Sequence, residues 1–130
     1  MSASPAPKKI LVVEDEAEYR ILLREILGKA GYAVSDASTG EEGWKLYAEQ
    51  QPDILLLDVM LPDMTGFDFC EKVRSGKIRP HTPILFCTVR SAVSQLAKGV
   101  KSGGTDYVLK PFDPDNLLVR VRSALDHGLA

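Results

Sequence analysis

The stretch from Asp53 to Pro62 limits the possible folds more than any other part of this chain. Four consecutive apolar residues, Ile54 to Leu57, lead directly to the carboxylate of Asp58. An apolar run of this kind between turn-forming residues is typical of a strand that is buried on both faces of a sheet. In open parallel α/β sheets, ligands bind at the carboxyl ends of the strands. Asp58 is therefore a candidate functional residue, although an acid in this position can also simply begin a turn.

Strand and helix patterns alternate along the whole chain. Strand patterns cover residues 8–13, 32–37, 54–57, 83–87 and 106–109, and helical spacing of apolar residues follows them at 19–27, 39–50, 67–73, 93–100 and 117–125. Strands that alternate with helices pair in parallel through right-handed crossovers. We therefore predict an α/β fold, a single doubly wound five-stranded parallel sheet (βα)5 in the flavodoxin-like order 2-1-3-4-5. The domain should span 8–127, between a disordered tail at 1–7 and a short C-terminal tail at 128–130.

Polar residues are suitably placed to begin three of the helices. Asp15 or a neighbour can cap the first helix, whose end Gly28 and Gly31 mark. The segment 38–42 has the spacing of a capping box. Asp113, followed by proline at the first helical position, should begin the last helix.

Length and composition exclude several classes of protein. The 130 residues carry a net charge of −2 without a basic patch, so we expect one domain that does not bind nucleic acid directly. No apolar run approaches the roughly 18 residues that a membrane span needs, and the first residues do not resemble a signal peptide. Cys70 and Cys87 lie within apolar patterns, which indicates buried, reduced thiols and favours a cytoplasmic location.

Polar side chains stand at the carboxyl ends of four predicted strands. Glu14 and Asp15 follow the first, and Asp58, Thr88 and Lys110 end three others. In a doubly wound sheet these ends converge on one edge. Carboxylates gathered there repel one another, because two unit charges about 4 Å apart cost on the order of 4 kcal/mol at an effective dielectric near 20. The cluster therefore needs a shared proton or a bound cation, and oxygen ligands with open positions suit Mg²⁺.

This set of side chains can support phosphoryl transfer. A carboxylate can act as the nucleophile and form an aspartyl phosphate. The metal ion, the Lys110 ammonium and the Thr88 hydroxyl would then stabilise charge on the transferring group. Lys110 can pair with a carboxylate before the transfer and with a phosphoryl oxygen after it.

Four parts of the sequence closely resemble the receiver domain of two-component response regulators. They are Val12–Glu16, Leu57–Gly66, Thr88 and Gly104–Phe112, and the resemblance extends from about Lys8 to Leu125. Each motif alone has low specificity, whereas four in the right order and spacing are specific. The resemblance implies a signalling switch that receives a phosphoryl group from a histidine kinase or a histidine phosphotransfer protein.

The resemblance also implies a role for each site residue. Asp58 would be the phosphoacceptor, Glu14 and Asp15 metal-site acids, the Met60 backbone carbonyl a further metal ligand, Thr88 and Lys110 phosphoryl contacts, and Tyr107 the switch aromatic that moves with Thr88. The ion would be Mg²⁺, or Mn²⁺ in its place. The Lys110–Pro111 peptide bond is expected to be cis. Because a receiver catalyses only its own phosphorylation and dephosphorylation, the chain is not expected to be an enzyme in the ordinary sense.

The sequence departs from the family pattern at three points. Glu14 stands where Asp is commoner, and its longer arm should still reach the metal directly or through water. Val89 follows Thr88 where the family prefers Ala or Gly, and its bulk could crowd the phosphoryl pocket. Met60 and Arg90 occupy positions that tune the lifetime of the phosphate, for which the sequence gives no value.

Each candidate residue also has a purely structural interpretation. The acids at 14–16 could only begin a helix, Thr88 could cap the next helix, Lys110 could be solvated, and Tyr107 could be a half-buried strand residue. Three other residues receive no functional role: Trp44 as packing on the second helix, and His81 and His127 as surface residues.

Three other functions share part of the pattern. A haloacid-dehalogenase-like phosphatase also uses Asp, Thr and Lys at strand ends, but it places a second Asp two residues after the nucleophile, where this chain has Met60. A receiver-like module that binds proteins without being phosphorylated is a second alternative, against which the complete set of site residues argues. A flavodoxin-like electron carrier has the same topology, yet nothing here resembles its hydroxyl-rich phosphate loop.

In the family, phosphorylation remodels the surface of the fourth helix, fifth strand and fifth helix, and we expect a downstream protein to bind there. Transcription-factor receivers often dimerise through this surface by three charged pairs. Asp106 and Arg120 could supply one pair, but Leu96 and Asn116 occupy the positions of another. We therefore predict a monomer that contacts no membrane, either a stand-alone receiver or a part of a longer regulator or hybrid kinase.

Overall fold

The computed structural model of the chain describes residues 6–89, 101 and 103–127. In chain order it contains β1 (Lys9–Val13), α1 (Ala17–Lys29), β2 (Ala33–Ala37), α2 (Gly40–Gln50), β3 (Ile54–Asp58), α3 (Gly66–Ser75), β4 (Ile84–Val89), β5 (Asp106–Lys110) and α5 (Pro114–His127). These elements agree with the predicted alternation, with ends that differ by one to three residues from the predicted patterns. The helix predicted at 93–100 and the outermost residues of both predicted tails lie outside the described residues.

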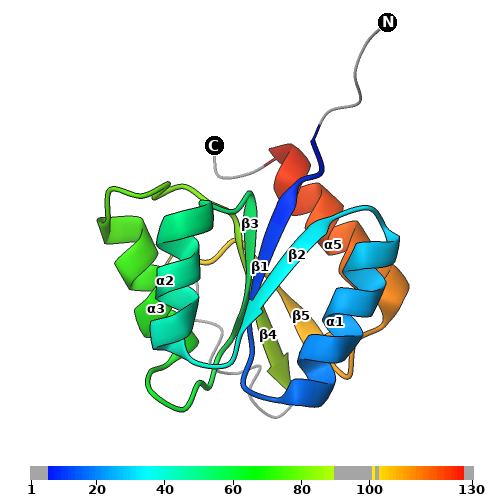
Figure 1. Ribbon diagram of the computed structural model, residues 1–130, viewed down its shortest axis with the longest axis horizontal. Coiled ribbons are helices and arrows are strands. Elements are labelled where there is room, and N and C mark those ends of the chain that lie inside the picture. Colours follow the sequence, from blue (N-terminus) through cyan, green and yellow to red (C-terminus); the bar gives the residue numbers. More distant parts are fainter. Residues whose placement is uncertain (1–5, 90–100, 102, 128–130) are drawn as a thin grey trace, which may run out of the picture.

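The five strands form one parallel sheet in the order β2-β1-β3-β4-β5, which confirms the predicted topology (Figure 1). β1 and β3 are neighbours, paired from Ile10 with Ile54 to Val13 with Leu57. The chain winds outward in one direction through β2 and in the other through β4 and β5. The carboxyl ends of β1 and β3 therefore lie at the topological switch point, where ligands bind in open α/β sheets.

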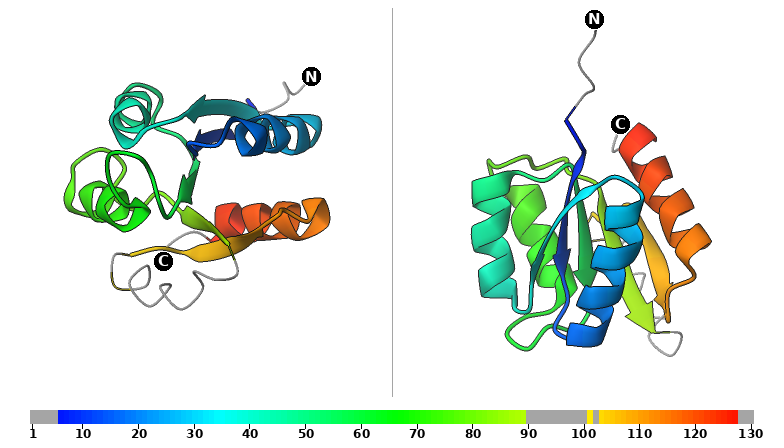
Figure 2. Two further views of the ribbon diagram at one scale, coloured as in Figure 1. Left: turned by 90° about the horizontal axis from the view of Figure 1, so that it is seen from below. Right: turned by 45° about the vertical axis from the view of Figure 1, so that its right-hand side comes forward.

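Helices cover both faces of the sheet. Figure 2 shows α1 and α5 on one face and α2 and α3 on the other. Along β3, Ile54 and Leu56 pack in the core with α1 and α5, whereas Leu55 and Leu57 pack in the core with α2 and α3. All four side chains are fully buried, and burial of each contributes on the order of 1.5–3 kcal/mol. Two-sided burial explains why this strand is apolar throughout.

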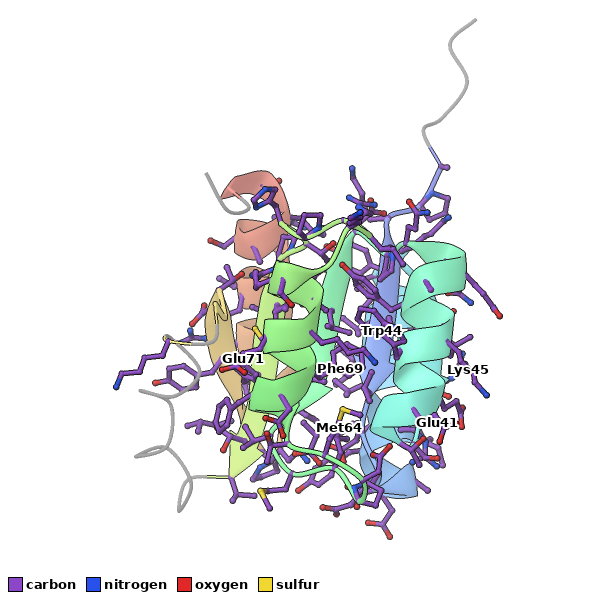
Figure 3. The ribbon with its side chains drawn as sticks, turned by 90° about the vertical axis from the view of Figure 1, so that its left-hand side faces the viewer. Glu41, Trp44, Lys45, Met64, Phe69 and Glu71 are labelled. Atoms are coloured by element: carbon purple, nitrogen blue, oxygen red, sulfur yellow. The ribbon has the colours of Figure 1, made fainter. Side chains whose placement is uncertain are left out.

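Aromatic side chains join α2 to α3. Trp44 stacks on Tyr47 with ring centroids 5.5 Å apart and meets Phe69 edge-on at 5.7 Å. The Lys72 ammonium lies 4.4 Å from the Trp44 ring. Figure 3 shows Trp44 and Phe69 between the two helices. Trp44 is thus a packing residue, as predicted.

Side chains from several segments determine where the helices begin. The Thr39 hydroxyl accepts a hydrogen bond from the Glu42 amide at 3.1 Å, which confirms the predicted start of α2. Asp113 accepts one from the Asn116 amide at 3.3 Å at the start of α5. The cap expected from Asp15 or a neighbour on α1 is wrong.

The N-cap residue of α1 is Glu16, and its side chain makes no capping hydrogen bond. The Glu14 carboxylate instead accepts a hydrogen bond from the Glu16 amide at 3.0 Å. The turn between β1 and α1 is therefore held by a residue that precedes the cap position.

Three smaller predictions concern burial and the membrane. Cys70 and Cys87 are both buried, and His81 is exposed. The side chain of His127 lies outside the described residues. Within the part of the chain that the structure describes, no helix combines the length and apolarity needed to cross a bilayer.

Candidate functional site

The carboxyl ends of β1, β3 and β5 bring three charged side chains together. Glu14 directly follows β1, while Asp58 and Lys110 are the last residues of their strands. The Lys110 ammonium forms an ion pair with Oε1 of Glu14 and lies 3.4 Å from Oδ2 of Asp58. At most 7% of each residue is exposed. The structure therefore places these residues at one edge of the sheet, as the sequence predicted.

The two carboxylates determine the charge state of Lys110. Burial by itself disfavours an ammonium ion, but the hydrogen bond to Glu14 and the negative charge of Asp58 outweigh it and raise the pKa of Lys110 above its usual value. Lys110 is therefore charged at neutral pH and is the counterion for both acids.

The environment of Asp58 has the opposite effect on the carboxyl group. Burial is the main cause that raises the pKa of Asp58, to about 7, and the nearby charge of Glu14 raises it further, while Lys110 partly offsets both. A further cation nearby would stabilise the ionised form of this carboxyl group. The Met60 amide donates a hydrogen bond of 3.3 Å to Oδ1 of Asp58, which fixes the orientation of the carboxyl group.

Beside this pair, the turn after β1 carries an acidic cluster. One carboxylate oxygen from each of Glu14, Asp15 and Glu16 lies within 4.8 Å of the others. Asp15 and Glu16 are exposed, whereas Glu14 is 1% exposed and has both oxygens engaged, one by Lys110 and one by the Glu16 amide. An all-oxygen set with open positions fits a hard divalent cation such as Mg²⁺. Asp15 and Glu16 are the acids exposed to such an ion, and Glu14 is better placed to orient Lys110.

The loop after β3 lies close against the end of that strand. The Gly66 amide donates a 2.7 Å hydrogen bond to the Val59 carbonyl. A Cβ atom at Gly66 would lie 2.3 Å from the Asp58 carbonyl oxygen, so only glycine allows this approach. Met60 stands in this loop with its side chain 62% exposed, and the metal-ligand role of its carbonyl stays a prediction.

Thr88 lies on β4 next to the site. The residue is buried, and its hydroxyl donates a 3.3 Å hydrogen bond to the Val89 carbonyl. Because this bond is long, the hydroxyl can turn to another acceptor at small cost. Val89 ends the strand and is 45% exposed, and Arg90 lies outside the described residues.

Tyr107 lies on β5, farther from Asp58. Its ring is half-buried, and the Arg120 guanidinium lies 5.2 Å from the ring centroid. Arg120 also forms an ion pair with Asp106 at 2.7 Å and donates a hydrogen bond to Asn116 at 3.2 Å. The Asp106–Arg120 pair, considered above as a bond between subunits, thus forms within one chain. Leu96 lies outside the described residues.

Two residues of α1 contact the site and were not predicted to do so. The Tyr19 ring lies 4.6 Å from the Lys110 ammonium and meets Phe112 edge-on. The Arg20 guanidinium donates hydrogen bonds to the carbonyls of Glu14 and Asp15. Helical spacing identified Tyr19 only as part of an apolar face, and a charged residue such as Arg20 has no signal of its own in that pattern.

A third unpredicted contact joins the loop after β3 to α2. The Asp63 carboxylate accepts hydrogen bonds from the Gly40 amide at 2.8 Å and the Glu41 amide at 2.9 Å. The hydrogen bond from Gly40 has the larger effect, and together the two bonds lower the pKa of Asp63.

The peptide bond between Lys110 and Pro111 is cis, as expected.

Comparison with known proteins agrees with this geometry. Residues 10–122 match the family model described as the response regulator receiver domain. The transcriptional regulatory protein ResD of Bacillus subtilis is 38% identical over 117 residues, which cover 90% of this chain and 48% of ResD. The alkaline phosphatase synthesis transcriptional regulatory protein PhoP of the same organism is 40% identical over 118 residues, 91% of this chain and 48% of PhoP. The chain thus spans about half the length of these curated relatives.

Solved structures show the same similarity in three dimensions. A putative response regulator from Chloroflexus aurantiacus has a TM-score of 0.88 and 35% identity, with 92% of this chain and 98% of that chain covered. The chemotaxis protein CheY4 of Vibrio cholerae has a TM-score of 0.85 and 33% identity, with 91% and 98% covered.

Proposed function

The chain belongs to the response regulator receiver domain family, and we propose that Asp58 is the residue on which it accepts a phosphoryl group. One observation supports this assignment above all others. Asp58 is a buried carboxyl group at the end of the central strand, at the switch point of the sheet, with a buried ammonium 3.4 Å away. A nucleophile needs this combination of fixed position and nearby positive charge when it attacks a phosphoryl group.

In the proposed reaction, an Asp58 carboxylate oxygen attacks phosphorus. The P–N bond of a donor phosphohistidine breaks, its electron pair returns to the imidazole, and an acyl phosphate forms on Asp58. The Met60 amide holds the carboxyl group in one orientation before the attack. Lys110 then lies beside the new phosphoryl oxygens and can exchange its contact with Asp58 for one with them.

We assign the metal site to Asp15, Asp58 and the Met60 carbonyl, with Glu14 as a further acid. A bound Mg²⁺, or Mn²⁺, would neutralise charge on the transferring phosphoryl oxygens. Without a cation, the Glu14 carboxylate adds to the effect of burial in raising the pKa of Asp58. The chain would supply these oxygens from the turn after β1, from the end of β3 and from the loop that follows it.

After transfer, Thr88 and Tyr107 would carry the response. The Thr88 hydroxyl would leave the Val89 carbonyl and donate to a phosphoryl oxygen. Tyr107 would have to move its ring relative to Arg120, which now lies over it. Phosphorylation can shift the equilibrium between the inactive and active conformations only by the difference in its interactions with the two. The free energy needed to separate Tyr107 from Arg120 would reduce that shift.

The partners follow from the same assignment. The donor would be a histidine kinase or a histidine phosphotransfer protein, the chain would turn over no separate substrate, and the two buried cysteines fit a cytoplasmic setting. ResD and PhoP are named transcriptional regulatory proteins, but this chain matches only about half of each. That this domain does not itself bind nucleic acid stays our prediction.

Phosphorylation with a small donor tests the proposed function. Incubation of the chain with Mg²⁺ and acetyl phosphate should add about 80 Da, and the added mass should be lost at alkaline pH as expected for an acyl phosphate. Intact-mass spectrometry measures both effects. With EDTA in place of Mg²⁺ the added mass should not appear, and equal phosphorylation in EDTA would contradict the metal site.

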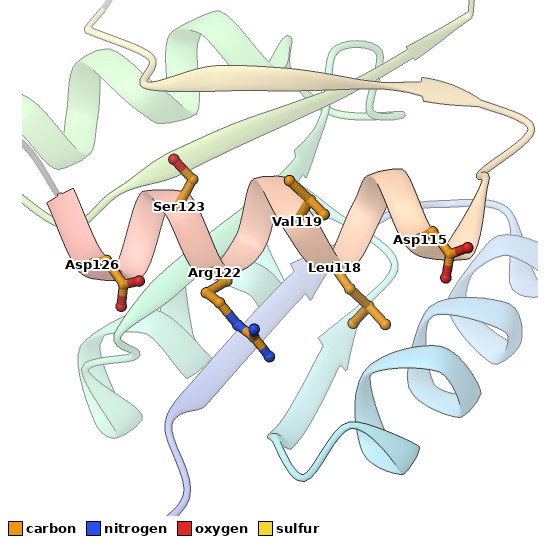
Figure 4. A pocket seen from close by; sticks show the side chains of 6 residues that line it. All are labelled: Asp115, Leu118, Val119, Arg122, Ser123 and Asp126. Carbon is orange, nitrogen blue, oxygen red and sulfur yellow. The ribbon is translucent and has the colours of Figure 1, made fainter.

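The structure also bears on the predicted oligomeric state. Figure 4 shows a hollow along α5 that is lined by Asp115, Leu118, Val119, Arg122, Ser123 and Asp126. Val119 is 67% exposed and stands among charged side chains, so this surface suits a mixed polar and apolar partner. Arg120 is already paired with Asp106 in its own chain. A bond from Arg120 to a second subunit would first have to replace that pair.

We therefore expect the activated domain to remain a monomer. An exposed ion pair contributes only ~0–1 kcal/mol, and here it must compete with an existing one. Sedimentation velocity at tens of micromolar, with Mg²⁺ and beryllofluoride as a phosphoryl mimic, measures the mass. A two-fold increase in mass on activation would show that the prediction is wrong.

A further inference from the structure

Arg20, at the end of the first turn of α1, holds the backbone of the acidic turn. Its Nη1 atom donates hydrogen bonds to the Glu14 carbonyl at 2.8 Å and to the Asp15 carbonyl at 2.9 Å. These two carbonyls belong to the residues between β1 and the N-cap of α1. One guanidinium nitrogen therefore fixes two successive peptide groups that carry metal-site acids.

Few other bonds restrain this turn. The Glu14 amide donates to the Ala37 carbonyl at 3.0 Å, the Glu16 amide donates to the Glu14 carboxylate at 3.0 Å, and Lys110 pairs with the same carboxylate. No side chain caps α1 at Glu16. Repulsion among the three clustered acids favours an opening of the turn, because their carboxylate oxygens lie within 4.8 Å of one another and like charges repel. Arg20 opposes that opening through both carbonyls.

We infer that Arg20 is a positioning residue for the divalent cation site. It touches neither the phosphoryl group nor the ion. It holds the Glu14–Asp15 backbone so that the carboxylate oxygens of the acidic turn stay within 4.8 Å of one another before the ion arrives. The inference rests on the proposed function, since it assumes that these acids bind Mg²⁺.

A different account would make Arg20 only a source of positive charge near the acids. The two accounts predict opposite changes in Mg²⁺ affinity when Arg20 is removed. If charge alone matters, removal of a cation beside a Mg²⁺ site should tighten Mg²⁺ binding, because a repulsive interaction is lost. If Arg20 positions the turn, its removal should weaken Mg²⁺ binding, as the loss of groups that orient metal ligands commonly does, by about 10–100-fold.

Arg24 provides a matched control on the same helix. It lies one turn further along α1 and carries the same charge, but it pairs with Asp36 and donates to the Val34 carbonyl at 3.2 Å. Arg24→Ala removes one positive charge from α1 without touching the acidic turn. Arg20→Lys keeps the charge, but its shorter side chain would have to bring one ammonium group to both carbonyls.

Mg²⁺ titration by isothermal calorimetry, on the full chain with EDTA removed, tests the inference. We expect Arg20→Ala to weaken Mg²⁺ binding by about ten-fold, Arg20→Lys to weaken it by less, and Arg24→Ala to leave it unchanged or slightly tighter. At saturating Mg²⁺, acetyl phosphate should phosphorylate Arg20→Ala to the wild-type extent. Such recovery would show that the variant is folded and has lost only affinity for Mg²⁺.

Each result decides between the proposals. If wild type binds Mg²⁺ and Arg20→Ala binds it equally or more tightly, the positioning role is wrong while the proposed function stands. If wild type binds no Mg²⁺ at millimolar concentration, the metal site itself is wrong and the inference falls with it. If Arg20→Ala does not fold, Arg20→Lys decides, because a charge-only role predicts wild-type affinity for that variant.

Discussion

Asp58→Ala should abolish phosphorylation of this domain, because it removes the atom to which the phosphoryl group would bond. Wild type should gain about 80 Da with Mg²⁺ and acetyl phosphate, and the variant should gain none under the same conditions. Intact-mass spectrometry measures the difference. The variant should still fold, since it loses one of two buried acids while the Lys110–Glu14 ion pair remains.

Two other acids are matched controls for this variant. Asp53 stands just before the opposite end of the same strand, where it accepts a hydrogen bond from the Lys9 amide and pairs with Arg79. Asp63 lies in the loop after the strand and caps α2. Asp53→Ala and Asp63→Ala should both still gain the phosphoryl mass. A normal mass increase in Asp58→Ala would overturn the assignment.

Asp58→Asn should stabilise the metal-free protein, and the gain should depend on pH. The pKa of Asp58 is raised in the folded chain to about 7 from an ordinary 3.8. The folded protein therefore retains a proton that the unfolded chain releases, so the free energy of unfolding falls as pH rises from about 4 to about 7. Asparagine cannot ionise and avoids this loss. Three pKa units set an upper limit of about 4 kcal/mol for the gain, and solvent relaxation reduces it.

Urea unfolding in EDTA at about pH 4.5 and about pH 7.5 measures this effect. The free energy of unfolding of Asp58→Asn should exceed that of wild type by a small amount at the lower pH and by a larger amount at the higher pH. Asp63→Asn should show no such change between these two pH values, since both lie above the ordinary pKa of 3.8. Because hydrogen bonds lower the pKa of Asp63, its contribution is present above the unfolded pKa and is lost in acid. An equal gain for Asp58→Asn at both pH values would show that ionisation of Asp58 is not the cause.

The predictable part of the site consisted of residues that end an apolar strand. Asp58 and Lys110 each follow a run of strand residues, and parallel strands bring such ends to one edge whatever the loops do. The same logic identified Asp113 as a helix start, because a cap depends only on residues three positions away. Patterns with a fixed local period were therefore enough for the topology and for the main charged residues.

Contacts that depend on side-chain reach could not be predicted in this way. Asp15 or a neighbour was predicted to cap α1, but the N-cap side chain makes no such bond, and the Glu14 carboxylate instead binds the Glu16 amide and Lys110. Whether Arg120 would meet Asp106 of its own chain depends on how α5 packs beside β5. Arg20 reaches back along the helix to a turn, a contact that the apolar periodicity of α1 does not encode.

The bonds from Asp63 to α2 have a consequence for the order in which the protein can be built. Two amides in the first turn of α2 bind a carboxylate that stands 23 and 22 positions further along the chain. On the ribosome, Gly40 and Glu41 emerge well before Asp63 does. The helix can form with Thr39 alone at its start, but its second cap arrives only after β3 and the following loop have been synthesised. The first turn of α2 thus gains these two hydrogen bonds only when translation has passed β3 and the loop that follows it.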